Sequence, residues 1–211
     1  MDEHDLSRPS TAAGGWAWLS GSAAQARELD LAVYGAIAST PTPSLDRGLG
    51  LLSRAANYSR LSLASAAVLA ASGGRRGRAA AGMGLASVAV TATVLNLGIK
   101  PIFRRRRPDR VAQEVPPARH VRMPQSTSFP SGHAAAAFAF ATGVGQVLPA
   151  AGFPLRALAA LVAYSRVHTG VHYPSDVLAG AMLGGALSQA TTHALARRSR
   201  RSRRTRLATG G

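Results

Sequence analysis

The sequence predicts an all-α integral-membrane protein, built as a bundle of about five to six helices. Alanine, a strong helix former, dominates the 211 residues, whereas β-branched and aromatic runs of strand length are scarce. Hydrophobic residues make up 46% of the chain, which is enough for a substantial core. Long uncharged stretches alternate with arginine clusters, as expected of helices that cross a bilayer and turn at its surfaces.

Three uncharged segments have the length of a membrane-spanning helix. Residues 79–99, 134–155 and 177–196 contain no Asp, Glu, Lys or Arg, and each is close to the roughly 20 residues that span a bilayer core. Residues 61–74 and 157–170 are shorter candidates. The mean hydropathy is only +0.06 because alanine and glycine replace leucine, and small residues suit closely packed membrane helices. The alternative is a set of buried helices in a soluble protein.

The two ends of the chain differ from its middle. Residues 1–27 are acidic and rich in Ser and Gly, without the regions of a secretory signal, so we expect a flexible leader. Residues 28–196 form the expected membrane-embedded domain; its first part, up to residue 52, carries apolar residues at helical spacing that indicate interfacial or packing helices. Residues 197–211 include seven arginines and are expected to be a basic, disordered tail.

The charge balance restricts the partners. The formal net charge of +16 suggests an anionic partner: nucleic acid, an anionic membrane or a phosphorylated substrate. Since the arginine tail adjoins a predicted span, we interpret it as a cytoplasmic anchor attracted to anionic lipid, and expect no nucleic acid. The chain has no cysteine, which excludes disulfides, thiolate metal sites and cysteine nucleophiles.

Three polar clusters lie at the ends of the apolar segments. They have the patterns K-x6-R-P, P-S-G-H and S-R-x5-H-x3-D, and together they run from Lys100 to Asp176. In these patterns the chain resembles the type 2 phosphatidic acid phosphatase family, lipid phosphatases that share a core with vanadium haloperoxidases and bacterial acid phosphatases. The resemblance implies that same helical core here. It covers the first half of the chain only as generic membrane helices.

The cluster residues suit phosphate chemistry. Lys100, Arg107 and Arg166 supply charged donors, and arginine's planar fork can hold two oxygens at once. Ser131 and Gly132 lie where a helix is expected to begin, so their N–H groups and the helix dipole would point at an anion. The remaining arginines of the RRRR run are expected to face solvent or lipid phosphate: Arg104, Arg105 and Arg106.

The resemblance also implies catalytic roles. His172 attacks phosphorus to form a phosphohistidine, His133 protonates the departing group, and water then cleaves the intermediate, with no metal and no cofactor. Asp176 lies four residues after His172, but Pro174 intervenes, so we predict a new helix starting near Pro174. From there Asp176 can reach back to orient the imidazole.

Other interpretations of the same residues remain open. His133 taken alone reads as a structural histidine, and His168 with His172 could suggest a metal pair, but no third ligand cluster stands out. A vanadate-dependent haloperoxidase shares the signature residues, although such enzymes are usually larger and soluble. A catalytically idle basic membrane scaffold is the alternative from a different class.

The sequence also predicts a membrane topology and a class of substrate. If the arginine tail is cytoplasmic, the predicted spans place Lys100, His133 and Asp176 together on the outer face of a multi-pass cell-membrane protein. Five and six spans both fit. The substrates that the resemblance implies are phosphatidate, phosphatidylglycerol phosphate, and polyprenyl phosphates or diphosphates.

Overall fold

The computed structural model describes residues 11–209, with side chains at residues 24–199, 201 and 202. This part of the chain consists of helices and loops, which confirms the all-α prediction, although it has seven α-helices instead of five or six. The helices are α1 (Thr11–Ser39), α2 (Pro43–Ala55), α3 (Arg60–Ser72), α4 (Gly74–Thr93), α5 (Gly132–Val147), α6 (Pro149–His168) and α7 (Pro174–Thr209). Short turns η1 (Asn57–Ser59), η2 (Val94–Ile99, a π-helical turn) and η3 (Pro117–Arg119) connect them.

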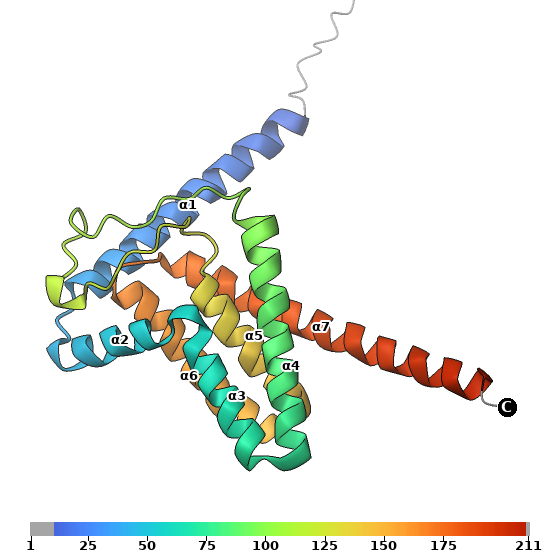
Figure 1. Cartoon of the computed structure of the whole chain (residues 1–211). Coiled ribbons are helices and arrows are strands. Elements are labelled where there is room, and N and C mark those ends of the chain that lie inside the picture. The colour runs from blue at the N-terminus through green and yellow to red at the C-terminus, as the bar shows by residue number, and fades with distance from the viewer. Residues whose placement is uncertain (1–10, 210–211) are drawn as a thin grey trace, which may run out of the picture.

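Helix α5 lies at the centre, packed against α4, α6 and α7 (Figure 1). Small residues allow this close packing. A Cβ on Gly143 of α5 would lie 2.6 Å from Ser87 Oγ of α4, and one on Gly180 of α7 would lie 2.5 Å from the carbonyl oxygen of Ser131. Ser188 of α7 donates to Ser87 Oγ at 2.9 Å, which joins α7 to α4 in the interior. Small residues with a few polar contacts are the packing expected of membrane helices.

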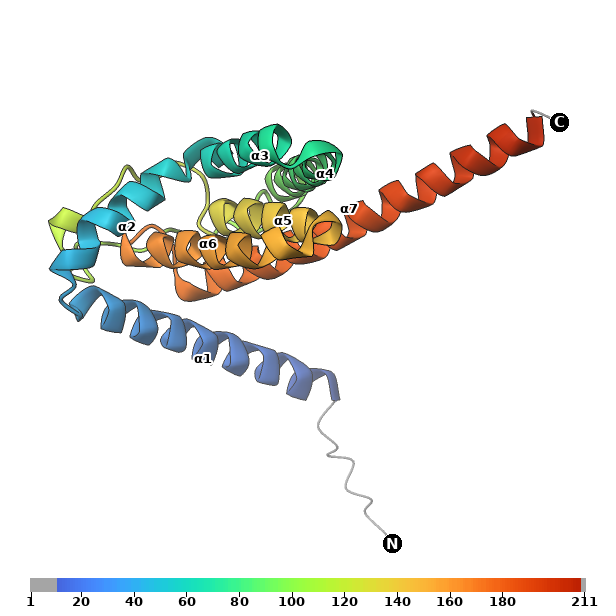
Figure 2. The same ribbon diagram turned by 90° about the horizontal axis from the view of Figure 1, so that it is seen from below.

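The bundle has two distinct ends. The α3–α4 and α5–α6 turns lie at one end, while α5 and α7 begin at the other (Figure 1). Helices α1 and α2 lie near the end where α5 and α7 begin (Figure 1). Figure 2 shows α1 and α3 on opposite sides of the bundle. The chain segments that carry the three sequence patterns therefore meet at one end of the bundle.

One predicted span is divided in the structure. Residues 134–155 fall on α5 and α6, because Leu148 leaves the helical conformation at φ −134° and Pro149 starts a new helix. Among the described residues, one helical stretch, Gly74–Ile99, is both long and apolar enough to cross a membrane. That stretch contains the predicted span of residues 79–99.

The two ends of the chain also differ from expectation. Helix α1 begins at Thr11, within the expected leader of residues 1–27, and α7 continues to Thr209 through most of the expected disordered tail. Alanine and arginine are strong helix formers, and a helix already packed at one end, as α1 is near Asp30 and Tyr34 and α7 is at its start, extends at little cost. Residues 1–10 and 210–211 lie outside the described part of the chain.

Candidate active site

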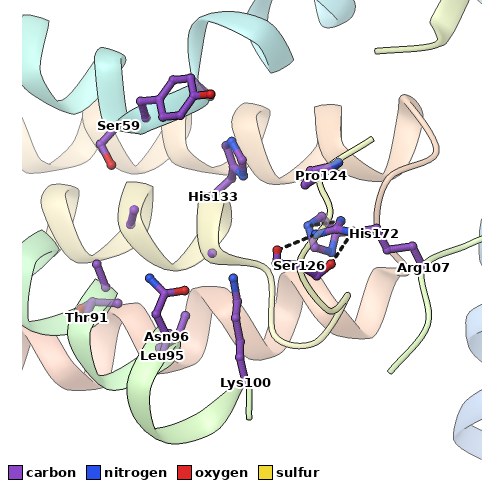
Figure 3. A pocket seen from close by; sticks show the side chains of 15 residues that line it. Ser59, Thr91, Leu95, Asn96, Lys100, Arg107, Pro124, Ser126, His133 and His172 are labelled. Atoms are coloured by element: carbon purple, nitrogen blue, oxygen red, sulfur yellow. Dashed lines mark hydrogen bonds between the residues drawn. The ribbon is translucent and has the colours of Figure 1, made fainter. Parts of the chain in front are cut away.

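A pocket of about 210 Å³ opens at the end of the bundle where α5 begins. Five of the sequence-predicted site residues line it: Lys100, Arg107, Gly132, His133 and His172. Figure 3 shows His172 and Arg107 at one side of the pocket, with His133 and Lys100 nearer its middle. Residues far apart in the sequence therefore converge on one cavity, as the three patterns predicted.

His172 lies in the loop between α6 and α7, backed by the first turn of α7. That helix begins at Pro174, where the sequence predicted a new start. From its first turn, Asp176 places Oδ2 3.4 Å from His172 Nδ1, at the long end of a hydrogen bond. Both side chains are almost completely buried. The predicted pair of an imidazole and an orienting carboxylate is thus present.

Other donors hold the Asp176 carboxylate in place. Ser128 Oγ donates to Asp176 Oδ2 at 2.5 Å, and the backbone N–H of Tyr173 donates to the same oxygen at 2.9 Å. Arg105 Nη1 donates to the other oxygen, Oδ1, at 2.9 Å. Because both oxygens accept hydrogen bonds, the carboxylate has little freedom to turn away from His172.

Arg105 corrects one sequence-based expectation. We expected it to face solvent or lipid phosphate, but it bridges two buried carboxylates: besides Asp176, it binds Asp30 of α1 at 2.6 Å. Its guanidinium also lies 4.2 Å from the centre of the Tyr173 ring, and Asp30 accepts from both the backbone N–H and the hydroxyl of Ser175. Helix α1 is therefore connected to the site through Asp30.

Arg107 contacts the edge of the His172 ring that carries Nε2, away from Asp176. Its Nη1 lies 3.2 Å from His172 Nε2 and donates to the carbonyl of Val171 at 2.8 Å, while Nε donates to the carbonyl of Ser126 at 2.9 Å. A guanidinium can only donate, so His172 Nε2 is an acceptor and the ring hydrogen is on Nδ1, toward Asp176. In this tautomer the single Nε2 lone pair accepts from Arg107, a residue that lines the same pocket.

The protonation states of the pair suit a nucleophile. Burial lowers the pKa of His172 to about 4 even though the hydrogen bond with Asp176 raises it, so the imidazole is neutral at neutral pH. For Asp176, burial favours the neutral form, but hydrogen bonds from His172 and Ser128 outweigh it and lower the pKa of the carboxyl. A neutral imidazole beside a carboxylate results.

The start of α5 forms a further wall of the pocket. Ser131 is the N-cap, its hydroxyl accepting from the N–H of Ala134 at 3.5 Å, as the predicted helix start requires. Its own N–H donates to the Asp176 carbonyl at 2.9 Å and so differs from the anion-facing donor that we expected. Gly132 lines the pocket, and a Cβ there would lie 3.4 Å from Lys100 Nζ. Glycine thus leaves room beside the lysine.

His133 belongs to the first turn of α5, just before the predicted span. Its Nε2 lies 2.9 Å from Oδ1 of Asn57 in η1. Burial lowers the pKa of His133 to about 3, and the nearby charges of Arg166, His172, Lys100 and Arg107 add to the effect. Burial likewise lowers the pKa of Lys100, with a contribution from Arg107. An anion in the pocket would relieve this crowding of cations.

Arg166 is placed differently from the other predicted phosphate ligands. Its Nη1 donates to the carbonyl and hydroxyl oxygens of Ser53 at 3.1 and 2.7 Å, and the side chain is 1% exposed. It does not line the pocket surface, although its charge acts on His133. Its Nε has no hydrogen-bond partner within the described residues. An unpaired donor on a buried guanidinium is unusual.

The possible metal pair is not formed. His168 Nε2 lies 3.0 Å from Asp46 Oδ1, and the same oxygen accepts from the buried Arg119 at 2.9 Å. Arg119 also donates to the carbonyls of Ile37 and Thr40 at the end of α1. His168 is thus part of a cluster that joins α1, α2 and α6. In the described part of the chain no three His, Cys, Asp or Glu side chains gather as metal ligands.

Four residues that contact the predicted site residues, directly or through Arg105, were not found from the sequence: Asp30, Asn57, Arg105 and Ser128. Each belongs to a chain segment outside the three patterns, except Arg105, which lies in the variable part of the first. Nothing in the sequence distinguishes Arg105 from Arg104 and Arg106. Only the folded positions of α1 and η1 show these contacts.

Two solved structures resemble most of this chain in fold and are similar to it in sequence. LpxE of Aquifex aeolicus superposes with a TM-score of 0.62 and 26% identity, over 78% of this chain and 95% of that one. A PAP2-type phosphatidylglycerolphosphate phosphatase of Bacillus subtilis gives 0.61 and 25%, over 82% and 87%.

Two relatives are similar in sequence over shorter stretches. Decaprenylphosphoryl-5-phosphoribose phosphatase of Mycobacterium tuberculosis is 43% identical over 90 residues, 42% of this chain and 47% of that protein. Lipid A 1-phosphatase of Rhizobium etli is 40% identical over 70 residues, 33% and 30% of the two chains. The matches thus span half or less of these curated relatives. Residues 81–200 match the model of the PAP2 superfamily, and the chain belongs to that superfamily.

Proposed function

We propose that this protein is a metal-independent membrane phosphatase that hydrolyses a lipid phosphate or diphosphate through a covalent intermediate on His172. The observation that carries the proposal is the position of His172 Nε2. It faces a cationic pocket, beside Arg107, while Nδ1 is directed to a buried carboxylate. That arrangement is what an activated imidazole nucleophile requires.

In the first step, Arg107 exchanges its contact with Nε2 for a phosphate oxygen. The freed Nε2 lone pair then attacks phosphorus, and the bond from phosphorus to the leaving oxygen breaks. Lys100, Arg107 and Arg166 stabilise the charge that the phosphoryl oxygens carry in the transition state, together with the N-terminus of α5 at Gly132. His133, charged once the phosphate is bound, gives its proton to the leaving oxygen.

In the second step, water attacks the phosphohistidine. His133, now neutral, accepts a proton from that water, and the bond between Nε2 and phosphorus breaks. Inorganic phosphate leaves and His172 regains the neutral tautomer. Asp176 keeps the Nδ1 hydrogen directed toward itself in both steps and stabilises the positive charge that forms on the ring.

The similar proteins support a lipid-linked substrate. Two of them are named for phosphate removal from decaprenylphosphoryl-5-phosphoribose and from lipid A, and a third for phosphatidylglycerol phosphate. Each substrate carries a phosphate attached to a lipid-bearing molecule. We therefore propose the same class of substrate here.

We also propose a multi-pass arrangement with the site on the outer face. The α3–α4 turn, with Arg75, Arg76 and Arg78, lies at the end of the bundle opposite the site, and the arginines after residue 196 follow the predicted last span. Arginines on one side of the bilayer favour the cytoplasm and anionic lipid. Cysteine labelling from outside the cell at Ile102 and at Ser199 tests this: only position 102 should react.

A phosphate-release assay tests the function. Purified protein in detergent is offered phosphatidate, phosphatidylglycerol phosphate, polyprenyl mono- and diphosphates, decaprenylphosphoryl-5-phosphoribose and lipid A. We expect phosphate release from at least one, inhibition by vanadate, which can bond to His172 as a phosphate analogue, and full activity in EDTA. Loss of activity in EDTA that zinc or magnesium restores contradicts metal independence. A folded protein that releases no phosphate favours the idle scaffold.

A further inference from the structure

We propose that the side of the pocket opposite His172 is a subsite for a hydroxyl-bearing leaving group, so that the preferred substrate carries its phosphate on a sugar. This inference rests on the proposed function, because it uses the direction in which the leaving group departs. Four residues that none of the sequence patterns includes form the subsite: Tyr58, Ser59, Thr91 and Asn96.

The general acid shows where the leaving group lies. In an in-line displacement the leaving oxygen departs opposite the nucleophile, toward the group that protonates it. In Figure 3, His172 is on one side of the pocket, Ser59, Thr91 and Asn96 are on the other, and His133 lies between them. The alcohol that leaves is therefore directed toward Thr91 and Asn96.

Thr91 has an unpaired hydroxyl at that side. The residue is 1% exposed, it lines the pocket, and its Oγ1 has no hydrogen-bond partner in the described part of the chain. Buried threonines on helices commonly donate to the carbonyl four residues earlier, as Thr169 and Thr191 do here at 2.7 Å. An unpaired buried hydroxyl costs free energy, so its position beside a cavity points to a ligand as partner.

Asn96 provides a second polar group on the same wall. It lies in the π-helical turn Val94–Ile99, which follows α4 and ends just before Lys100. Such turns occur frequently at functional sites. The amide can donate and accept, and Thr91 and Asn96 both line the pocket. A polyhydroxylated ring could bond to both.

Tyr58 and Ser59 form the facing wall, in η1. Both have left-handed backbone angles, with φ of 56° and 55°, which non-glycine residues adopt at a cost. Tyr58 lines the pocket although it is 80% exposed, and the Arg60 guanidinium lies 5.5 Å from the ring centre. The preceding residue, Asn57, holds His133. The η1 turn thus brings the Tyr58 ring to the pocket and, through Asn57, holds the general acid His133 beside it.

The chemistry of this wall favours a sugar over an acyl or prenyl chain. A hydrocarbon chain beside Thr91 would leave its buried hydroxyl without a partner, whereas a sugar hydroxyl would satisfy it and could also bond to the exposed amide of Asn96. Sites built to bond a hydroxyl discriminate strongly against analogues that lack it. An exposed tyrosine ring adds apolar contact for the face of a sugar.

The test compares two substrates in three variants. Thr91→Val removes the hydroxyl at constant size, Asn96→Leu removes the amide, and Thr93→Val is the matched control, because Thr93 is exposed on the same helix. kcat/KM is measured for decaprenylphosphoryl-5-phosphoribose and for phosphatidate. We expect Thr91→Val and Asn96→Leu each to lower kcat/KM roughly tenfold for the sugar phosphate, mainly through KM. Activity on phosphatidate should be unchanged or higher, and Thr93→Val should match wild type on both.

Other outcomes separate the two proposals. If wild type cleaves the sugar phosphate no better than phosphatidate, or if Thr91→Val and Asn96→Leu affect both substrates equally, the sugar subsite is refuted and the phosphatase function stands. If wild type releases phosphate from neither substrate nor from the wider panel, the proposed function itself fails. Circular dichroism of each variant identifies loss of folding. For a misfolded variant, Thr91→Ala or Asn96→Ala removes the same polar group, and Thr91→Ser, which keeps the hydroxyl, should retain the preference.

Discussion

The two histidines of the pocket are held in very different ways. His172 is 2% exposed and lies against Asp176, a carboxylate fixed by Ser128, Arg105 and a backbone N–H. His133 has one side-chain partner, Asn57, which belongs to a turn with strained backbone beside an open cavity. In the proposed mechanism His172 performs the same attack on every phosphate, so it can be fixed rigidly. The general acid must serve the leaving group, which differs between substrates.

Removing the nucleophile should have the largest effect. His172→Ala is expected to lower kcat by at least about 10⁴-fold on every substrate, because no neighbouring group can form the phosphoenzyme. Phosphate release from lipid and aryl phosphates measures it. Wild-type-like turnover by a folded variant on either substrate would remove His172 from the mechanism.

Removing the general acid should divide substrates by leaving group. His133→Ala is expected to cost roughly 10²- to 10⁴-fold on a lipid phosphate, whose alkoxide departs poorly without a proton. p-Nitrophenyl phosphate releases a stable phenolate, so the rate of its first step, measured as the pre-steady-state burst of nitrophenolate, should stay far closer to wild type. Equal losses in the first step on the two substrates would mean that His133 chiefly binds phosphate or holds the start of α5.

Removing the arginine that holds the Asp176 carboxylate should have a smaller effect. Arg105→Gln removes the ion pairs with Asp176 and Asp30, and we expect kcat to fall roughly 10- to 100-fold while KM changes little. Arg104→Gln, on an exposed neighbour, is the matched control and should resemble wild type. If the two variants behave alike, Arg105 does not position Asp176.

Removing the tail should have the smallest effect on catalysis. Deleting residues 197–211 is expected to leave kcat/KM in detergent unchanged, since the described site lies at the start of α7. Binding to vesicles that contain anionic lipid should weaken. A folded but inactive truncated enzyme would show that the tail contributes to the site.

The same contrast explains what could be predicted from the sequence. The uncharged alanine-rich segments predicted the helices, and the spacing around Pro174 predicted the start of α7 and the approach of Asp176 to His172. The contact of His133 with Asn57 was not predictable, because Asn57 lies in a segment that none of the three patterns includes. Asp30 was missed for a similar reason: its role depends on where α1 lies. The break at Leu148 was missed because no charge interrupts the segment.

The central claim is that His172 carries the phosphoryl group, and intact-protein mass spectrometry of a quenched reaction tests it most directly. His133→Ala is mixed with p-nitrophenyl phosphate, and the reaction is quenched without acid. Without His133 no base accepts the proton of the attacking water, so the phosphoenzyme should be hydrolysed slowly and accumulate. The account predicts a phosphorylated protein whose modification maps to His172, is lost in acid, and is absent from the double variant with His172→Ala. Steady turnover without that adduct, or an adduct on another residue, would contradict it.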